Sequence, residues 1–467
     1  MSELCDASAT ELLEQFESGA VSPVEVMESV LHRMDAAEPH LCATWLPDHD
    51  GAMAAARASE DRWRRKTPVG PLDGVPVTIK EMIATKGAPK PVGTAAGDMT
   101  PQAEDAPPAA RLREAGAIPF AKTTNPDFGM LSSGLSSFHK LARNPWDLSK
   151  TPGGSSAGAA AAAAAGYGPL HLGTDIGGSI RLPAGWCGVF GLKPSLGRVP
   201  IDPPYIGRVA GPMTRTVADA ALMMRVLSLP DDRDYMSLPF AELDWIDLKA
   251  DVRGLKIALQ MDAGCGIPVE PETAAAVERA AAMFEAAGAI VERVDPFLTA
   301  EMLNGLDRFW RARFLDEMAR IPEDRHASIL PYIRAWVEGA RSYSGQDVYT
   351  GFNQIMIMRM LGQRQFAPYD YLLSPVSPVA AFPAELPSPL DDPDRPFEHI
   401  GFTVAWNMTE QPAASINCGY TAQGLPIGLQ IVGRRFDDVG VLRLSHAFEA
   451  MRGEQRPWPV IGKASLS

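Results

Sequence analysis

The chain of 467 residues has few of the features that mark a secreted, metal-binding or nucleic-acid-binding protein. Its five cysteines are scattered, odd in number and not at metal-ligand spacing, which predicts reduced thiols, no bound metal and a cytoplasmic location. An excess of basic residues is also missing, because 43 Lys and Arg stand against 57 Asp and Glu, a net charge of −14. This balance argues against nucleic acid or an anionic membrane as a partner.

Long apolar runs and targeting signals are missing too. The alanine run at 159–165 is too short to span a bilayer. Residues 1–6 are acidic and lack the basic segment and apolar stretch of a signal peptide. Together with the net charge, these absences favour a protein that acts on small neutral molecules. We expect it to need no cofactor and to be a monomer or a homodimer.

A serine stands in each of two glycine-rich segments: Ser155 in T-P-G-G-S-S-A-G and Ser179 in G-T-D-I-G-G-S-I-R. Glycine lets a ligand approach the backbone closely, so Gly177-Gly178 predicts a tight turn with inward-pointing N–H groups. Such a turn can stabilise the oxyanion of an acyl-transfer reaction. We also expect Ser155 or Ser156 to cap the helix formed by the alanine run.

A serine nucleophile needs a base, and the sequence offers a lysine rather than a histidine. The histidine nearest the two serines is His171, whose apolar neighbours predict a strand. Lys80 instead ends an apolar strand expected at 75–80. Burial lowers the pKa of a lysine and makes it a base, and serine–lysine pairs are a known variant of triad catalysis.

These motifs resemble those of the amidase signature family of serine hydrolases. The resemblance covers about 70–449 and is weak between 231 and 364. Further matching segments are G-V-P-V-T-I-K at 74–80, K-T-T-N-P-D-F-G at 122–129, C-G-V-F-G-L-K-P at 187–194 and Q-P-A-A-S-I-N-C-G at 411–419.

The resemblance implies a role for each residue of a catalytic triad. Lys80 corresponds to the family's base, Ser155 to its bridging serine and Ser179 to its nucleophile. In the family the bridging serine follows a cis peptide bond, so the Gly154–Ser155 bond is expected to be cis.

The resemblance also implies supporting residues around the nucleophile. The backbone N–H groups of Ile176, Gly177 and Gly178 are expected to form the oxyanion hole. Asp175 and Arg181 flank this turn and are expected to form an ion pair that holds it.

The substrate contacts are less specific. Met130 and Leu131 stand where relatives line the acyl pocket, which favours an apolar or aryl acyl or carbamoyl group. Ordinary core residues are an equally good interpretation of both. Met82, where the family usually has asparagine, predicts a more apolar wall near the lysine.

The pattern of elements predicts an α/β protein. Strands at 75–80, 117–122 and 170–174 alternate with helices at 107–115 and 156–165. The resemblance implies one large mixed twisted β-sheet covered by helices on both faces. We divide this one compact domain into an N-terminal helical segment (1–66), the signature core (67–230), a variable helical region that shapes the substrate cleft (231–395) and a C-terminal return to the core (396–467).

Together these features predict a hydrolase that cleaves the C–N bond of a small amide, anilide or carbamate, or an ester, through an acyl-enzyme. Two alternatives stay open. One is the amidase subunit of a glutamine-dependent tRNA amidotransferase, although 136–141 departs from the Y-G-x-T pattern common there. The other is a binding protein without catalysis. The loop at 387–396 is a candidate lid.

Overall fold

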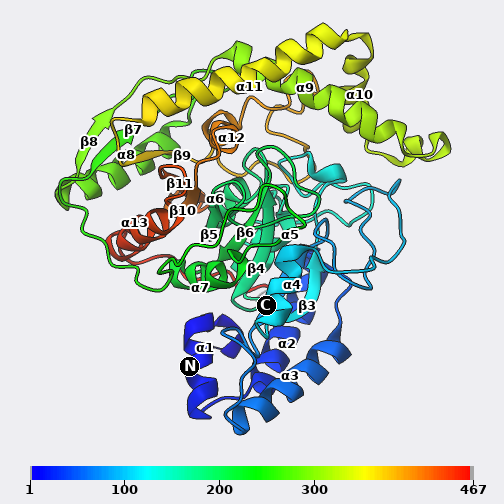
Figure 1. Ribbon diagram of the computed structural model, residues 1–467, viewed down its shortest axis with the longest axis vertical. Helices are drawn as coiled ribbons and strands as arrows, with labels where there is room; N and C mark the ends of the chain where they lie inside the picture. The colour runs from blue at the N-terminus through cyan, green and yellow to red at the C-terminus, as the bar shows by residue number, and fades with distance from the viewer. Residues whose placement is uncertain (1–2, 463–467) are drawn as a thin grey trace.

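The computed structural model describes residues 3–462, and in them it shows a single mixed sheet of eleven strands (Figure 1). The order across the sheet is β1-β3-β2-β4-β6-β5-β10-β11-β9-β7-β8. The strands are β1 (Thr44–Trp45), β2 (Pro76–Lys80), β3 (Ile118–Thr123), β4 (Leu170–Asp175), β5 (Phe190–Lys193), β6 (Val209–Thr214), β7 (Lys256–Leu259), β8 (Ile290–Arg293), β9 (Tyr371–Pro375), β10 (Ala413–Tyr420) and β11 (Pro426–Val432).

Helices pack around this sheet, as expected for the α/β class. They are α1 (Ala9–Ser18), α2 (Pro23–Leu41), α3 (His49–Arg64), α4 (Pro107–Glu114), α5 (Ala157–Ala165), α6 (Arg181–Cys187), α7 (Val217–Leu227), α8 (Pro271–Ala286), α9 (Ala300–Ala319), α10 (Pro331–Glu338), α11 (Gly345–Phe366), α12 (Gly401–Met408) and α13 (Asp438–Met451). The predicted strands at 75–80, 117–122 and 170–174 are confirmed to within one residue at each end.

The apolar core has two large parts on opposite faces of the sheet. Neighbouring residues of a strand point to opposite faces. Leu373 and Ile431 belong to the part that packs against α2, α7 and α13, whereas Leu372 and Val432 belong to the part that packs against α9 to α12. The prediction of helices on both faces is therefore confirmed.

Parallel pairing of β2 with β4 positions the predicted catalytic residues. Thr78 pairs with His171 and Ile79 with Leu172. Because parallel strands end at the same edge of a sheet, Lys80 at the end of β2 comes to lie beside the end of β4. The glycine-rich turn with Ser179 follows β4 directly.

The alanine helix α5 is buried on every side. Alanine side chains are small enough to let this helix lie close to β4 and α6 at once. The helix ends at Gly166, whose φ of 79° is the left-handed conformation that glycine adopts readily. Contrary to expectation, no serine side chain caps its N-terminus: Ser156 is the N-cap residue, but its hydroxyl is used elsewhere.

The variable region contributes strands β7, β8 and β9 to the sheet, and its helices α9 to α11 form a layer over one face, in which α9 and α11 lie side by side (Figure 1). Its aromatic residues are mainly core, since Trp310, Phe314 and Trp336 are at most 3% exposed. The loop at 387–396 is tied to this layer, because Arg311 donates a hydrogen bond to Pro393 O and Tyr332 donates one to Asp392 O.

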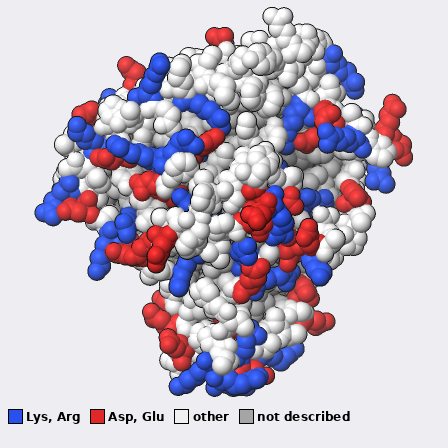
Figure 2. All heavy atoms as spheres, viewed as in Figure 1, with Lys and Arg blue, Asp and Glu red and all other residues white. Residues whose placement is uncertain are grey.

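Charges of both signs are interspersed over the face of the molecule seen in Figure 2. Within residues 3–462, no helix combines the length and the apolar character needed to cross a bilayer.

The tight packing of α5 generates a stability prediction. A Cβ on Gly158 would lie 2.0 Å from Ala43 O and 2.5 Å from Thr124 N, so Gly158→Ala forces two backbone segments apart. We expect a loss of about 1–3 kcal/mol in the free energy of unfolding, measured by urea denaturation. Gly345→Ala, at the start of α11 with no atom within 4 Å, is the matched control and should cost nothing. Equal midpoints for the two variants would contradict this account of the packing.

Candidate active site

Lys80 lies at the centre of a buried group of hydroxyls. Its side chain is 0% exposed, and Nζ lies 2.8 Å from Ser155 Oγ, 2.9 Å from Thr174 Oγ1 and 3.1 Å from Ser156 Oγ. Burial lowers the pKa of Lys80 to about 7, because a charged ammonium loses its hydration there. The neutral amine that a base requires is therefore accessible near neutral pH.

The hydroxyls around Lys80 have distinct roles. Ser156 Oγ donates to Thr174 O at 3.1 Å, and Thr174 Oγ1 lies 3.7 Å from Met82 Sδ, to which it donates. With their own protons engaged, both hydroxyls accept from Lys80. A neutral amine has two N–H groups and one lone pair, so the lone pair is left facing the Ser155 hydroxyl. This arrangement suits a base that removes the proton of Ser155.

The two serines differ in their access to solvent. Ser155 is 2% exposed, and its peptide bond with Gly154 is cis, as the resemblance implies. Within residues 151–190, all of which the structure describes, only Thr174, Ile176 and Ser179 are not buried. Ser179 is thus the serine that a substrate can reach.

A backbone hydrogen bond joins the two serine segments, since the Ser156 N–H donates to Ser179 O at 3.1 Å. Among the described residues, no hydrogen bond links the Ser155 and Ser179 hydroxyls directly. The Ser155 side chain therefore contacts Lys80, while the next residue along the chain, Ser156, is bonded through its backbone to Ser179.

The turn before Ser179 offers fewer free donors than the sequence predicts. The Gly178 N–H donates to Asp175 Oδ1 at 2.8 Å, so the expectation that it serves an oxyanion is wrong. The N–H groups of Ile176 and Gly177 have no acceptor among the described residues, and neither has that of Ser179. Thr403 Oγ1 donates to Gly177 O at 2.6 Å and so orients the peptide that follows.

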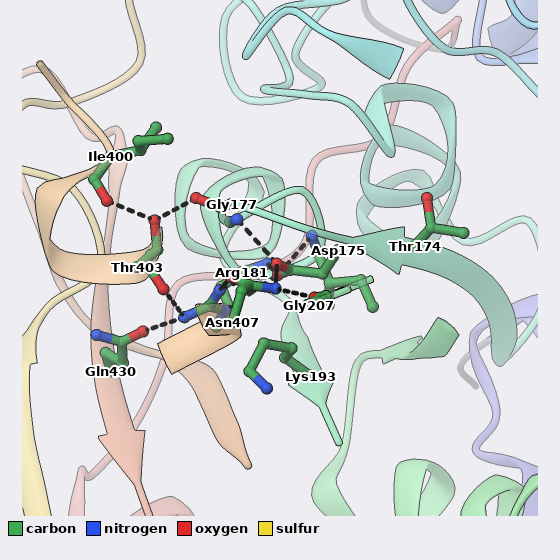
Figure 3. A network of polar contacts seen from close by, with 12 residues as sticks. Thr174, Asp175, Gly177, Arg181, Lys193, Gly207, Ile400, Thr403, Asn407 and Gln430 are labelled. Atoms are coloured by element: carbon green, nitrogen blue, oxygen red, sulfur yellow. Dashed lines mark hydrogen bonds and ion pairs between the residues drawn. The ribbon is translucent and has the colours of Figure 1, made fainter. Parts of the chain in front are cut away.

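The expected pair of Asp175 and Arg181 is present and is fully buried (Figure 3). Arg181 Nε and Nη2 donate to the two Asp175 oxygens, each at 3.0 Å. Arg181 Nη1 donates to Thr403 O at 2.9 Å and to Gln430 Oε1 at 2.7 Å, and Asn407 Nδ2 donates to Asp175 Oδ1 at 2.9 Å. Burial alone would raise the pKa of Asp175, but the Arg181 charge holds it well below its usual range.

Sequence reasoning missed several of these partners. Thr174 lies within the motif G-T-D-I-G-G-S-I-R, but nothing in that motif indicates that its hydroxyl contacts the lysine. Gln430 did leave a signal, because it is the one polar side chain in the apolar strand β11. Thr403 and Asn407 come from α12, which is far away in sequence and reaches Asp175 and Gly177 only through the fold.

A lowered pKa does not by itself identify the base. Burial also lowers the pKa values of Lys122 and Lys193 to about 7, and that of His171 to about 3. Lys122 donates to Ile83 O and Lys193 to Pro194 O, whereas His171 bonds to Thr78 and Gly168 O. Lys80 alone among these four contacts a serine hydroxyl.

A cavity of about 180 Å³ opens beside this group of hydroxyls. Thr174, Met82 and Phe128 line the end nearest Lys80, which agrees with the predicted apolar wall at Met82. Met130 and Leu131 do not line it. They lie in a separate pocket of about 10 Å³, the space of one water molecule, against Trp336 and Phe397.

Comparison with known proteins identifies the family. The amidase family model matches residues 25–442, and nearly the whole chain is covered. The chain belongs to the amidase signature family. It is therefore related to enzymes that act on C–N bonds.

Individual relatives differ in what they do. A glutamyl-tRNA(Gln) amidotransferase subunit of Chloroflexus aurantiacus is 34% identical over 99% of this chain and 100% of its own length. An acylamidase of Rhodococcus erythropolis is 34% identical over 97% of this chain and 96% of its own. The structure of a bacterial aryl acylamidase superposes with a TM-score of 0.87 at 31% identity, over 95% of this chain and 96% of that one.

Within residues 3–462, no three His, Cys, Asp or Glu side chains are grouped so that they could hold a metal ion.

The orientation of Lys80 generates a prediction on pH. Thr174→Val removes one of three acceptors of the ammonium and destabilises the charged form. We expect the acid limb of kcat/KM to move to lower pH and the plateau to fall, because the lone pair is no longer held toward Ser155. Thr174→Ser keeps the hydroxyl and should keep the wild-type pH profile. A purely structural role for Thr174 would lower activity without moving the limb.

Proposed function

We propose that this protein is an amidase that hydrolyses the C–N bond of small amides, anilides or carbamates through an acyl-enzyme on Ser179. The observation that carries the proposal is the 2.8 Å contact between Lys80 Nζ and Ser155 Oγ in a fully buried site. Beside it, Ser179 is the one member of the triad that reaches solvent. A buried base and relay next to an accessible hydroxyl is the arrangement that acyl transfer needs.

The mechanism follows from the roles of these groups. Neutral Lys80 takes the proton of Ser155, Ser155 takes that of Ser179, and Ser179 Oγ attacks the carbonyl carbon. The oxyanion rests on the N–H groups of Ile176 and Gly177. Ser155 then returns the proton to the leaving amine, and water hydrolyses the acyl-enzyme. Two donors held in place before the reaction lower the barrier without reorganisation.

The frame below the turn supports this preorganisation. Asp175 accepts the Gly178 N–H and the Ile180 N–H, and Arg181 holds the same carboxylate from the other side. These bonds engage the N–H groups of Gly178 and Ile180. Within residues 3–462 they leave the N–H groups of Ile176, Gly177 and Ser179 without an acceptor, and we assign the first two to the oxyanion.

A second candidate function is that of a glutamine-hydrolysing amidotransferase subunit. The relative from Chloroflexus aurantiacus supports it with the same identity as the acylamidase does. The departure of 136–141 from the Y-G-x-T pattern argues against it. Release of ammonia from glutamine, together with co-purification of a partner subunit, would favour this candidate. Turnover of anilides by the isolated chain would favour the amidase.

The proposed base generates a pH prediction. The base must be unprotonated, so kcat/KM should rise with pH through about 7 and level off above it. A lysine of ordinary pKa, near 10.5, would instead give a rate that still rises above pH 9. Lys80→Met should lower kcat by about 10²–10⁴-fold. Lys122→Met, another buried lysine with a similarly lowered pKa, is the matched control and should keep the midpoint.

The proposed nucleophile generates a labelling prediction. A fluorophosphonate probe should form one covalent adduct, which mass spectrometry of peptides should place on Ser179. Ser179→Ala should abolish both the adduct and anilide turnover. Ser228→Ala, a partly exposed serine at the end of α7, should change neither. Turnover that survives in Ser179→Ala would refute the assignment, and a chain that never labels would favour a non-catalytic binding protein.

A further inference from the structure

Cationic side chains line the 180 Å³ cavity that opens beside the Lys80 site. Lys90, Arg208 and Arg313 contribute to this lining, together with the carboxylates of Asp202 and Glu317. The mechanism uses none of these residues. Thr174 lines the same cavity and contacts Lys80, so the cavity reaches the surroundings of the proposed base, although Ser179 is not among its lining residues.

Two of the three cations have no acidic partner. Arg313 Nε donates to Glu317 Oε1 at 2.8 Å, which neutralises that pair. Arg208 donates only to the carbonyl of Pro203, at 2.7 Å, and no carboxylate of the described residues forms an ion pair with it. Lys90 Nζ has no hydrogen bond or ion pair within residues 3–462. Arg208 and Lys90 therefore have hydrogen-bond donors that are available to a ligand.

Burial and mutual repulsion destabilise the charged forms of Lys90 and Arg208. Burial, and then the Arg208 charge, lower the pKa of Lys90, while burial and Arg313 lower that of Arg208 to about 10. Asp202, the remaining carboxylate, is exposed and therefore screened by water. Unpaired cations that face one another in a partly buried space are stabilised by an anion.

The position of the cations is set by packing. The Arg313 guanidinium lies 3.9 Å from the ring centroid of Tyr205. Tyr205 and Arg208 belong to one turn, in which the Arg208 N–H donates to Tyr205 O at 3.1 Å. Helix α9 and this turn thus hold the two guanidinium groups at one cavity wall before any ligand binds.

We propose that Arg208 and Lys90 bind a carboxylate of the substrate, so that the preferred amides carry an acid group. A guanidinium meets a carboxylate with two parallel hydrogen bonds, which fixes direction as well as charge. Three cations against two carboxylates leave one positive charge, which a monoanion balances. This inference rests on the proposed hydrolytic function. It also revises the expectation of neutral substrates, because the local charge is opposite to the net charge of −14.

The test compares two substrates that differ by one terminal carboxylate: butyric acid 4-nitroanilide and glutaric acid mono-4-nitroanilide, both followed by release of 4-nitroaniline. The uncharged mono-amide of the glutaric compound controls for its added size. We expect a kcat/KM at least about tenfold higher for the glutaric compound, as for one hydrogen-bonded charge pair. Arg208→Gln and Lys90→Gln should each bring the ratio of the two kcat/KM values toward one. The ratio is the readout because the Arg208 charge also lowers the pKa of Lys80, and that effect is the same for both substrates. Arg320→Gln, which changes an exposed arginine at the C-terminal end of α9, should keep it.

A binding measurement separates this inference from the proposed function. Glutarate should raise the melting temperature of Ser179→Ala, and the shift should disappear in Ser179→Ala/Arg208→Gln. Binding that depends on Arg208, without hydrolysis of either anilide, would refute the proposed function and support the carboxylate site. Hydrolysis of both anilides at equal rates, or a preference that survives in Arg208→Gln/Lys90→Gln, would overturn the site while the amidase stands.

Discussion

The burial of Lys80 is the constraint on which the rest of the site depends. A lysine in water is protonated at neutral pH and cannot take a proton, and removal of its hydration brings its pKa to about 7. The sheet makes this burial possible by ending β2 and β4 at one edge. The hydroxyls of Ser155, Ser156 and Thr174 then replace water around the amine without adding a negative charge.

A second constraint, the buried pair of Asp175 and Arg181, determines the shape of the turn before Ser179. Asp175 accepts hydrogen bonds from the backbone as well as from Arg181, and α12 and β11 complete its surroundings. A buried charge pair stabilises only when its remaining donors and acceptors are satisfied, and here each guanidinium nitrogen has a partner. The pair therefore serves as a rigid frame from which the reactive peptide groups project.

The cavity joins this rigid frame to the variable region. Residues of the signature core, Arg208 and Lys90 among them, form most of its lining, and Arg313 and Glu317 of α9 contribute the rest. The chemistry of acyl transfer belongs to the core, because it needs fixed distances between hydroxyls and an amine. In our proposal, the charges of Arg208 and Lys90 in this cavity select the substrate.

The sequence by itself determined the fold class, the strand boundaries around Lys80, the cis peptide at Ser155 and the pair of Asp175 and Arg181, because each depends on local pattern or on motifs that travel together. It could not determine which N–H groups are free, since Gly178 is taken by a carboxylate three residues away. It also assigned a helix cap to Ser155 or Ser156, whose hydroxyls both contact the lysine instead. Only the tertiary structure decided these points, because the partner of a polar group depends on which competing atom lies in its direction, whether near in sequence like Asp175 or distant like Lys80.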